Sequence, residues 1–120
     1  MIKQFENEHV RLERTKGIIK VTYSVEHMTL PIARECVRDR IWMFSDTLFL
    51  VDHSSIKTLD RDASKYLASP AAFQGIGKCA LLTDKLLLKL VFNLYFSIIK
   101  QPSAVKYFTS EEDGIKWLHD

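Results

Sequence analysis

Cysteine, glycine and proline are scarce in this chain of 120 residues, which contains two, four and three of them. Cys36 and Cys79 lie far apart and each sits among apolar residues. We therefore expect reduced, buried thiols of a cytosolic protein, and neither a disulfide nor a zinc site. Because 47% of the residues are hydrophobic, a single domain over residues 1–120 can bury a core without such cross-links.

An excess of charge of one sign is also lacking. Lysine and arginine number 17 and aspartate and glutamate 15, a net charge of +2. A protein that binds nucleic acid usually carries a basic face, so this balance argues against nucleic acid as a partner. The segment Met1 to Glu8 has no apolar core, so we predict no secretion signal and a cytoplasmic location.

Long hydrophobic runs are absent except for residues 86–99. This segment has 14 residues, fewer than the roughly 17 to 25 that span a membrane, and Lys89 and Asn93 lie within it. We therefore expect no transmembrane segment. On a helix, Lys89, Asn93 and Ser97 form one narrow polar stripe, because they are four residues apart.

The predicted helix 86–99 is more apolar than its packing on a sheet requires. A surface helix needs an apolar face of only about 100°. We expect the remaining apolar surface to form a homodimer interface, or alternatively the wall of a pocket for a small apolar ligand or lipid. The residues predicted for the dimer face are Leu87, Leu90, Val91, Phe92 and Tyr95.

Strand and helix patterns alternate along the chain and predict an α/β fold. We expect a mixed and mainly parallel sheet of about five strands that opens with a β-hairpin, with about four helices packed on it. The expected strands are His9–Glu13, Ile18–Tyr23, Thr47–Val51, Cys79–Leu82 and Ala104–Phe108. The expected helices start at Thr29, at Asp60 or Asp62, after Asp84 and at Ser110.

The first expected helix has a clear apolar pattern. Thr29 is its predicted cap and Pro31 lies near its first position. Its core face, read from spacings of three and four, comprises Ile32, Ala33, Cys36, Val37, Ile41 and Phe44.

Polar side chains follow the predicted strands, where ligands gather in open α/β sheets. Asp52, His53, Ser54 and Ser55 follow one strand, Thr83 and Asp84 the next, and Thr109 and Ser110 the last. An Asp, His and Ser set suggests nucleophilic catalysis, but its members must converge, and adjacent residues at a strand end point in different directions. We therefore assign no catalytic residue.

Cofactor and metal sites are not predicted either. The four histidines have no metal-ligand spacing. A phosphate-binding glycine loop opens a helix. Gly75, Ile76 and Gly77 precede a strand, so they do not predict such a loop. These observations predict a protein that is not an enzyme.

Two stretches resemble a known family. Residues 51–67 read Val-Asp-His-Ser-Ser-Ile-Lys-Thr-Leu-Asp-Arg-Asp-Ala-Ser-Lys-Tyr-Leu, similar to the signature of STAS domains, the anti-sigma-factor antagonist fold. In that signature an aspartate ends a strand, and Asp-Ser-Ser-Gly opens a helix that reaches a leucine. Residues 108–118, Phe-Thr-Ser-Glu-Glu-Asp-Gly-Ile-Lys-Trp-Leu, resemble the ending of a STAS-like group of small, mostly uncharacterised bacterial proteins.

The resemblance implies a regulatory role through protein contacts, but one motif differs. In STAS domains a serine of Asp-Ser-Ser-Gly accepts phosphate, and the added charge switches partner binding. Here Asp60 is kept, while Arg61, Asp62 and Ala63 replace Ser-Ser-Gly, so Asp62 stands at the phosphoacceptor position. We expect a dimeric interaction module with an unidentified protein partner and without this switch. Its candidate interaction loop comprises Asp52, His53, Ser54, Ser55, Asp60 and Asp62.

Overall fold

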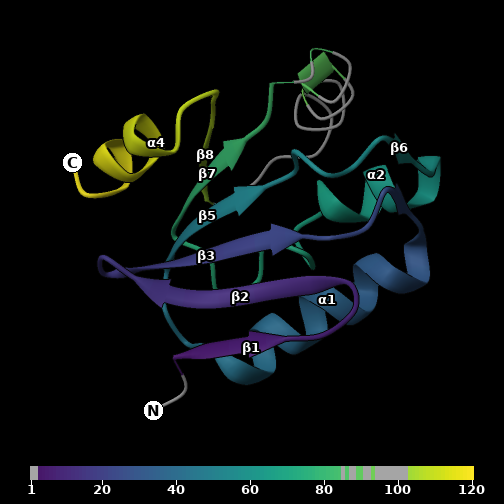
Figure 1. Cartoon of the computed structure of the whole chain (residues 1–120), viewed down its shortest axis with the longest axis horizontal. Coiled ribbons are helices and arrows are strands. Elements are labelled where there is room, and N and C mark those ends of the chain that lie inside the picture. Colours follow the sequence, from purple (N-terminus) through teal and green to yellow (C-terminus); the bar gives the residue numbers. More distant parts are fainter. Residues whose placement is uncertain (1–2, 85, 87–88, 91–92, 94–102) are drawn as a thin grey trace.

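The computed structural model describes residues 3–84, 86, 89–90, 93 and 103–120. Within these residues, six strands form one mixed sheet in the order β1-β2-β3-β5-β7-β8 (Figure 1). Strands β1 to β3 pair antiparallel, and β3, β5, β7 and β8 pair parallel. The strands are β1 (Gln4–Glu6), β2 (Val10–Thr15), β3 (Ile18–Tyr23), β5 (Leu48–Asp52), β7 (Lys78–Leu82) and β8 (Ala104–Phe108).

The predicted mixed and mainly parallel sheet is therefore confirmed, with one strand more than expected. The predicted hairpin is β2–β3, and its two-residue turn places Lys16 and Gly17 at φ 52° and 75°. Positive φ at both central positions is typical of a type I′ turn. The additional strand, β1, has three residues, of which Phe5 alone is partly buried, so its sequence carries too little alternation to be recognised.

A second, small parallel sheet pairs β4 (His27–Met28) with β6 (Thr58–Leu59). It was not predicted, because two-residue strands have no periodicity to detect. Its register brings His27 beside Thr58. The connection between β5 and α2 is thereby attached to the start of α1.

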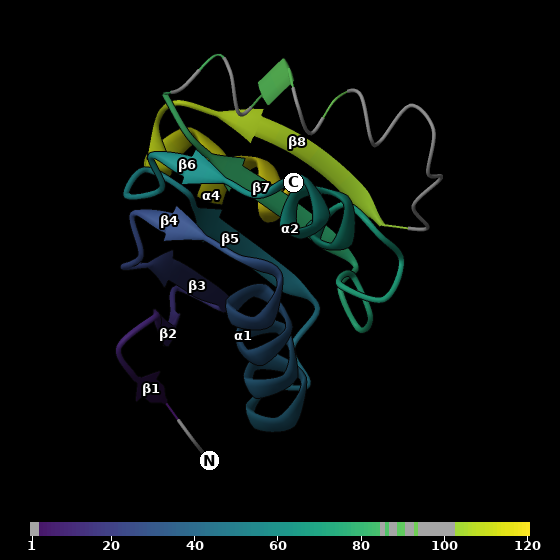
Figure 2. The ribbon, with the colours of Figure 1, turned by 90° about the vertical axis from the view of Figure 1, so that its right-hand side faces the viewer.

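The helices α1 (Leu30–Met43), α2 (Arg61–Leu67) and α4 (Glu111–Leu118) cover the main sheet. Figure 2 shows α1 and α2 on one side of it and α4 on the other. Of the predicted helix 86–99, Leu86, Lys89, Leu90 and Asn93 are helical. Leu87, Val91, Phe92 and Tyr95, four of the five predicted dimer-face residues, lie outside the described residues. None of the described helices is long and apolar enough to cross a membrane.

Strand register assigns the core residues to two layers. Val21, Val51 and Leu81 are aligned across β3, β5 and β7, and belong to the larger core beneath α1 and α2. Leu50 and Ala80, one position earlier on β5 and β7, face the other way and pack with Leu118 of α4. The central strands are therefore buried on both faces, which explains their continuous apolar sequences.

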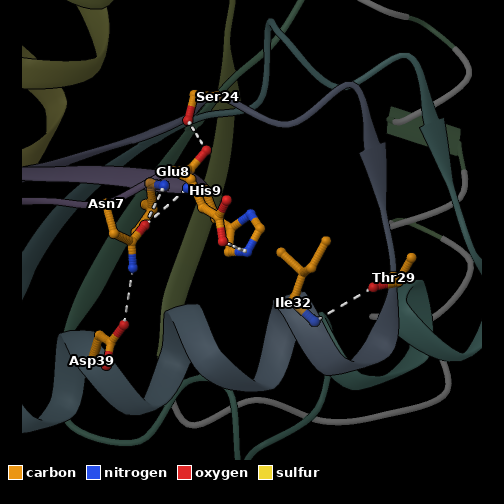
Figure 3. Close-up of polar contacts among 8 residues, drawn as sticks. Asn7, Glu8, His9, Ser24, Thr29, Ile32 and Asp39 are labelled. Carbon is orange, nitrogen blue, oxygen red and sulfur yellow. Dashed lines mark hydrogen bonds and ion pairs between the residues drawn. The ribbon is translucent and has the colours of Figure 1, made fainter.

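Helix α1 begins as its sequence predicts. The Thr29 hydroxyl accepts a hydrogen bond from the Ile32 N–H at 3.4 Å, and a proline lies in the first turn. Figure 3 shows this cap and a second attachment: the Asn7 amide, in the β1–β2 connection, donates to Asp39 of α1 at 3.4 Å. The β1–β2 connection is thereby linked to the helix.

The predicted core face of α1 was wrong at one position. Ile41 is 36% exposed, whereas Arg40 is only 6% exposed and faces the sheet with Cys36 and Val37. The Arg40 guanidinium lies 5.1 Å from the centre of the Phe49 ring and donates to two backbone carbonyls. These contacts offset part of the cost of burying a charge that the apolar pattern of the sequence placed outside the core.

Gly114 provides a test of the α4 layer, because a side chain there would meet the sheet. A Cβ atom at Gly114 would lie 3.0 Å from Leu50 Cδ1 and 3.5 Å from Ala80 Cβ. We expect Gly114→Leu to lower the free energy of unfolding by about 1–3 kcal/mol through overpacking, measured by urea denaturation. Lys116→Leu, on the exposed side of the same helix, should change it by less than about 0.5 kcal/mol. Equal midpoints for the two variants would contradict this packing.

Candidate functional site

The polar residues after β5 occupy a short loop with an ordered backbone. The Asp52 carboxylate accepts a hydrogen bond from the Ser54 N–H at 2.9 Å. The His53 N–H donates to the Leu82 carbonyl at 2.9 Å, and the Ile56 N–H donates back to the His53 carbonyl at 3.0 Å. The loop therefore continues from the carboxyl ends of β5 and β7, as the strand pattern predicts.

His53 points into the protein. It is 3% exposed, and its ring centre lies 5.3 Å from that of Tyr23. Burial lowers the pKa of His53 from 6.5 to about 4, against the opposing effects of the Asp52 charge and a hydrogen bond with the Val51 backbone. At neutral pH this imidazole is uncharged.

Ser54 and Ser55 are exposed, in contrast to His53. The His53 ring is buried against Tyr23, whereas these two serine side chains face solvent. A base that activates a serine must lie within hydrogen-bond reach of it. The structure therefore separates the Asp, His and Ser set into a buried imidazole and exposed hydroxyls.

The other strand ends contribute little to a common site. Thr83 is buried, and its N–H donates to the Phe108 carbonyl at 3.1 Å. Asp84 and Thr109 are exposed. The Ser110 hydroxyl accepts a hydrogen bond from the Asp113 N–H at 3.4 Å, so it serves as the predicted cap of α4.

Asp60 and Asp62 are both exposed at the start of α2. Asp60 occupies the N-cap position, but its carboxylate does not cap the helix and contacts His27 Nε2 at 3.0 Å. The other ring nitrogen of His27 contacts the Thr58 hydroxyl. Asp62 lies in the first turn, where its negative charge interacts favourably with the helix dipole.

The cluster of His27, Thr58 and Asp60 could not be found from sequence, because β4 and β6 bring together residues about 30 positions apart. A hydroxyl, an imidazole and a carboxylate are the groups of nucleophilic catalysis. The side chains of His27 and Asp60 are 55% and 48% exposed, however. Water at this level of access screens the charges that catalysis requires, so we interpret the cluster as the attachment of α2 to β4.

A cavity of about 50 Å³ lies on the α1 side of the sheet. Its walls come from α1, β3, β5, β7, the end of α2 and the segment 72–76. Most of the lining is apolar, and its polar members are Tyr23, Cys36, Arg40, His53 and Cys79. Sequence reasoning missed Arg40, and the available signal was its position four residues after Cys36, on the same face of α1.

The charges around the cavity are unbalanced. Cys36 and Cys79 are free and buried, as predicted, and burial raises the pKa of both thiols to about 12. Burial also raises the pKa of Tyr23 and lowers that of Arg40. At neutral pH the thiols and the phenol are uncharged, and Arg40 is the cationic group of the lining. Within the described residues, no group of three or more His, Cys, Asp or Glu could hold a metal ion.

The arrangement of strands and helices defines a STAS-like domain. The chain is similar to the crystal structure of an uncharacterized protein from the DUF3478 family, with a SpoIIAA-like fold, from Shewanella loihica PV-4. The TM-score is 0.64 at 15% sequence identity, and the match covers 95% of this chain and 98% of that chain. This likeness shows the fold and confirms the resemblance that the two sequence motifs indicated.

The family follows from the sequence itself. Residues 12–120 match the family described as "Domain of unknown function (DUF7793)", so the chain belongs to that family. A comparison with curated proteins finds no match.

The buried imidazole makes stability depend on pH. Above pH 6.5 His53 is neutral in both the folded and the unfolded chain. Between pH 6.5 and about 4 the unfolded chain binds more protons, so the free energy of unfolding falls as the pH falls. The slope due to this group is at most about 1.4 kcal/mol per pH unit.

We expect His53→Phe to remove this contribution while keeping a ring beside Tyr23. Urea unfolding of both proteins at pH 7, 6, 5 and 4.5 measures it. The wild-type protein should lose more stability than the variant as the pH falls. Parallel losses would show that His53 is not buried as an uncharged ring.

Proposed function

We propose that this protein is a non-enzymatic protein-interaction module whose contact surface is the strand-end loop, residues 52–62. The observation that carries the proposal is the combination of exposed polar side chains with a fixed backbone. Ser54, Ser55, Asp60 and Asp62 are exposed. A preorganised loop loses little conformational entropy when a partner binds, which favours recognition.

Hydrogen bonds hold the strand-end loop at several points. The N–H groups of Lys57 and Thr58 donate to the Glu26 carbonyl at 2.7 and 3.0 Å, and the Asp60 N–H donates to the Met28 carbonyl at 3.0 Å. The loop is thereby fixed to the segment that precedes α1. Its exposed side chains therefore present a defined pattern to a partner.

The proposed mode of binding needs no phosphate. Asp62 stands at the position of the phosphoacceptor serine of STAS domains and already carries a negative charge. Ser64, a possible substitute, is 3% exposed and donates to the Asp60 carbonyl at 3.1 Å. Ser54 and Ser55 are exposed serines of the strand-end loop. A regulatory role through this loop is the function that the STAS-like fold and its exposed residues support best.

We also propose that the protein forms a homodimer through the segment 86–99. Leu86 and Leu90 are 68% and 57% exposed, and they lie one helical turn apart. Large exposed apolar side chains on one face are typical of an interaction surface. A twofold dimer would bury this face against its own copy.

The alternative function, a carrier of a small apolar ligand or lipid, has less support. The cavity of about 50 Å³ is lined in part by the segment 72–76. Ligand pockets usually have volumes of about 300–1,000 Å³. The volume of this cavity is well below that range.

The strand-end loop can be tested by charge reversal. We expect Asp62→Lys to reduce capture of protein partners at least tenfold, measured by quantitative mass spectrometry after cross-linking in a lysate of the source organism. Glu112→Lys, an exposed reversal on α4 at the opposite face of the sheet, is the matched control. Equal partner sets and amounts for Asp62→Lys and wild type would contradict the role of the loop.

The dimer requires a separate experiment. We expect a dimer for the wild-type protein in native mass spectrometry and sedimentation, and a monomer for Leu86→Glu with Leu90→Glu, because two buried carboxylates would oppose association. Arg38→Glu, on the exposed face of α1, should stay dimeric. A wild-type monomer, or a variant that sediments as the wild type does, would contradict this interface.

A further inference from the structure

Arg40 is a buried cation without a counter-charge. It is 6% exposed, and it lines the cavity of about 50 Å³. Every Asp and Glu of the chain lies within the described residues. None of them forms an ion pair with Arg40. A buried charge is normally paired, because removal from water is costly.

The protein satisfies only part of the hydrogen-bonding capacity of Arg40. One terminal nitrogen donates to the Gln74 carbonyl at 3.0 Å and the other to the Ala72 carbonyl at 2.9 Å. A guanidinium has five N–H donors, so three remain. Neutral carbonyls also leave the positive charge uncompensated.

A second donor lies on the cavity wall. Tyr23 is 5% exposed and lines the cavity, and its hydroxyl has no hydrogen-bond partner among the described residues. The Tyr23 ring lies against His53, which holds the phenol in the core. Two buried side chains thus bring unused donors to one small cavity.

We propose that this cavity is a binding site for a small carboxylate anion, of the size of formate or acetate, held by Arg40 and Tyr23. The planar guanidinium matches a carboxylate through two parallel hydrogen bonds, and the phenol adds a third. The apolar remainder of the lining suits one methyl group. The volume of about 50 Å³ is small, which favours a ligand of a few heavy atoms.

The neutral state of the neighbouring groups supports this assignment. The thiols of Cys36 and Cys79 and the phenol of Tyr23 have raised pKa values because they are buried. None of them supplies the missing negative charge at neutral pH. An anion from solution would supply it, and this inference is independent of the proposed interaction loop.

The test is a titration of ¹⁵N-labelled protein with sodium acetate, followed by NMR. The probes are the Arg40 side-chain N–H and the backbone amides of residues 72–76. Sodium gluconate keeps the ionic strength constant, because its chain is too long for the cavity. Acetamide, which has the shape of acetate without its charge, is the matched control ligand.

We expect saturable shifts with acetate and none with acetamide. A ligand of four heavy atoms should bind no tighter than tens of micromolar. Tyr23→Phe keeps the ring and removes one hydrogen bond to the anion, so it should weaken binding about tenfold. Arg38→Gln, an exposed arginine on the same helix, should bind as wild type does.

Arg40→Met should abolish binding. Because it also loses the bonds to the Ala72 and Gln74 carbonyls, this variant could fail to fold, and Tyr23→Phe then decides alone. Unsaturable shifts with acetate, equal shifts with acetamide, or unchanged affinity in Tyr23→Phe would each overturn the site.

Discussion

Parallel register in β3, β5, β7 and β8 is the constraint on which both layers of this domain depend. Successive residues of a strand face opposite sides, so a slip of one residue would exchange the two faces. In the observed register, Val51 and Leu81 face α1 and α2, while Leu50 and Ala80 face α4. Continued to the strand ends, the same register places Tyr23 beside His53. The separation of the strand-end residues into a buried group and an exposed loop thus follows from strand pairing.

Burial of Arg40 is the costly feature of this arrangement. Its aliphatic stem fills a core position on α1, and its guanidinium contacts the Phe49 ring and holds the segment 72–76 through two carbonyls. An apolar residue would pack there without loss of hydration, so a charge at this position has a use beyond packing. A small anion in the adjacent cavity accounts for the charge. The exposed strand-end loop, on a separate surface, remains available to a protein partner.

Most of the fold could be predicted from the sequence, because strand alternation, helix caps and apolar spacing are local signals. Thr29 and Ser110 cap their helices as expected, and the hairpin turns at Lys16 and Gly17. The small β4–β6 sheet and the buried Arg40 could not be predicted, since each depends on contacts between distant segments. The strand-end residues and their different directions were recognised, but the burial of His53 among them was not. Apolar spacing placed Ile41 in the core because that pattern depends on hydropathy alone, whereas an arginine whose aliphatic stem packs against apolar side chains can also take a core position.

Strand register and α1 together form the cavity where Arg40 and Tyr23 present unused donors to an anion. A crystal structure at about 1.5 Å, from crystals soaked in acetate, tests this site most directly. We expect planar density within hydrogen-bond distance of the Arg40 guanidinium and the Tyr23 hydroxyl, with His53 buried beside the phenol. A structure in which the Arg40 side chain points to solvent would contradict this site. So would a cavity that holds only water at saturating acetate.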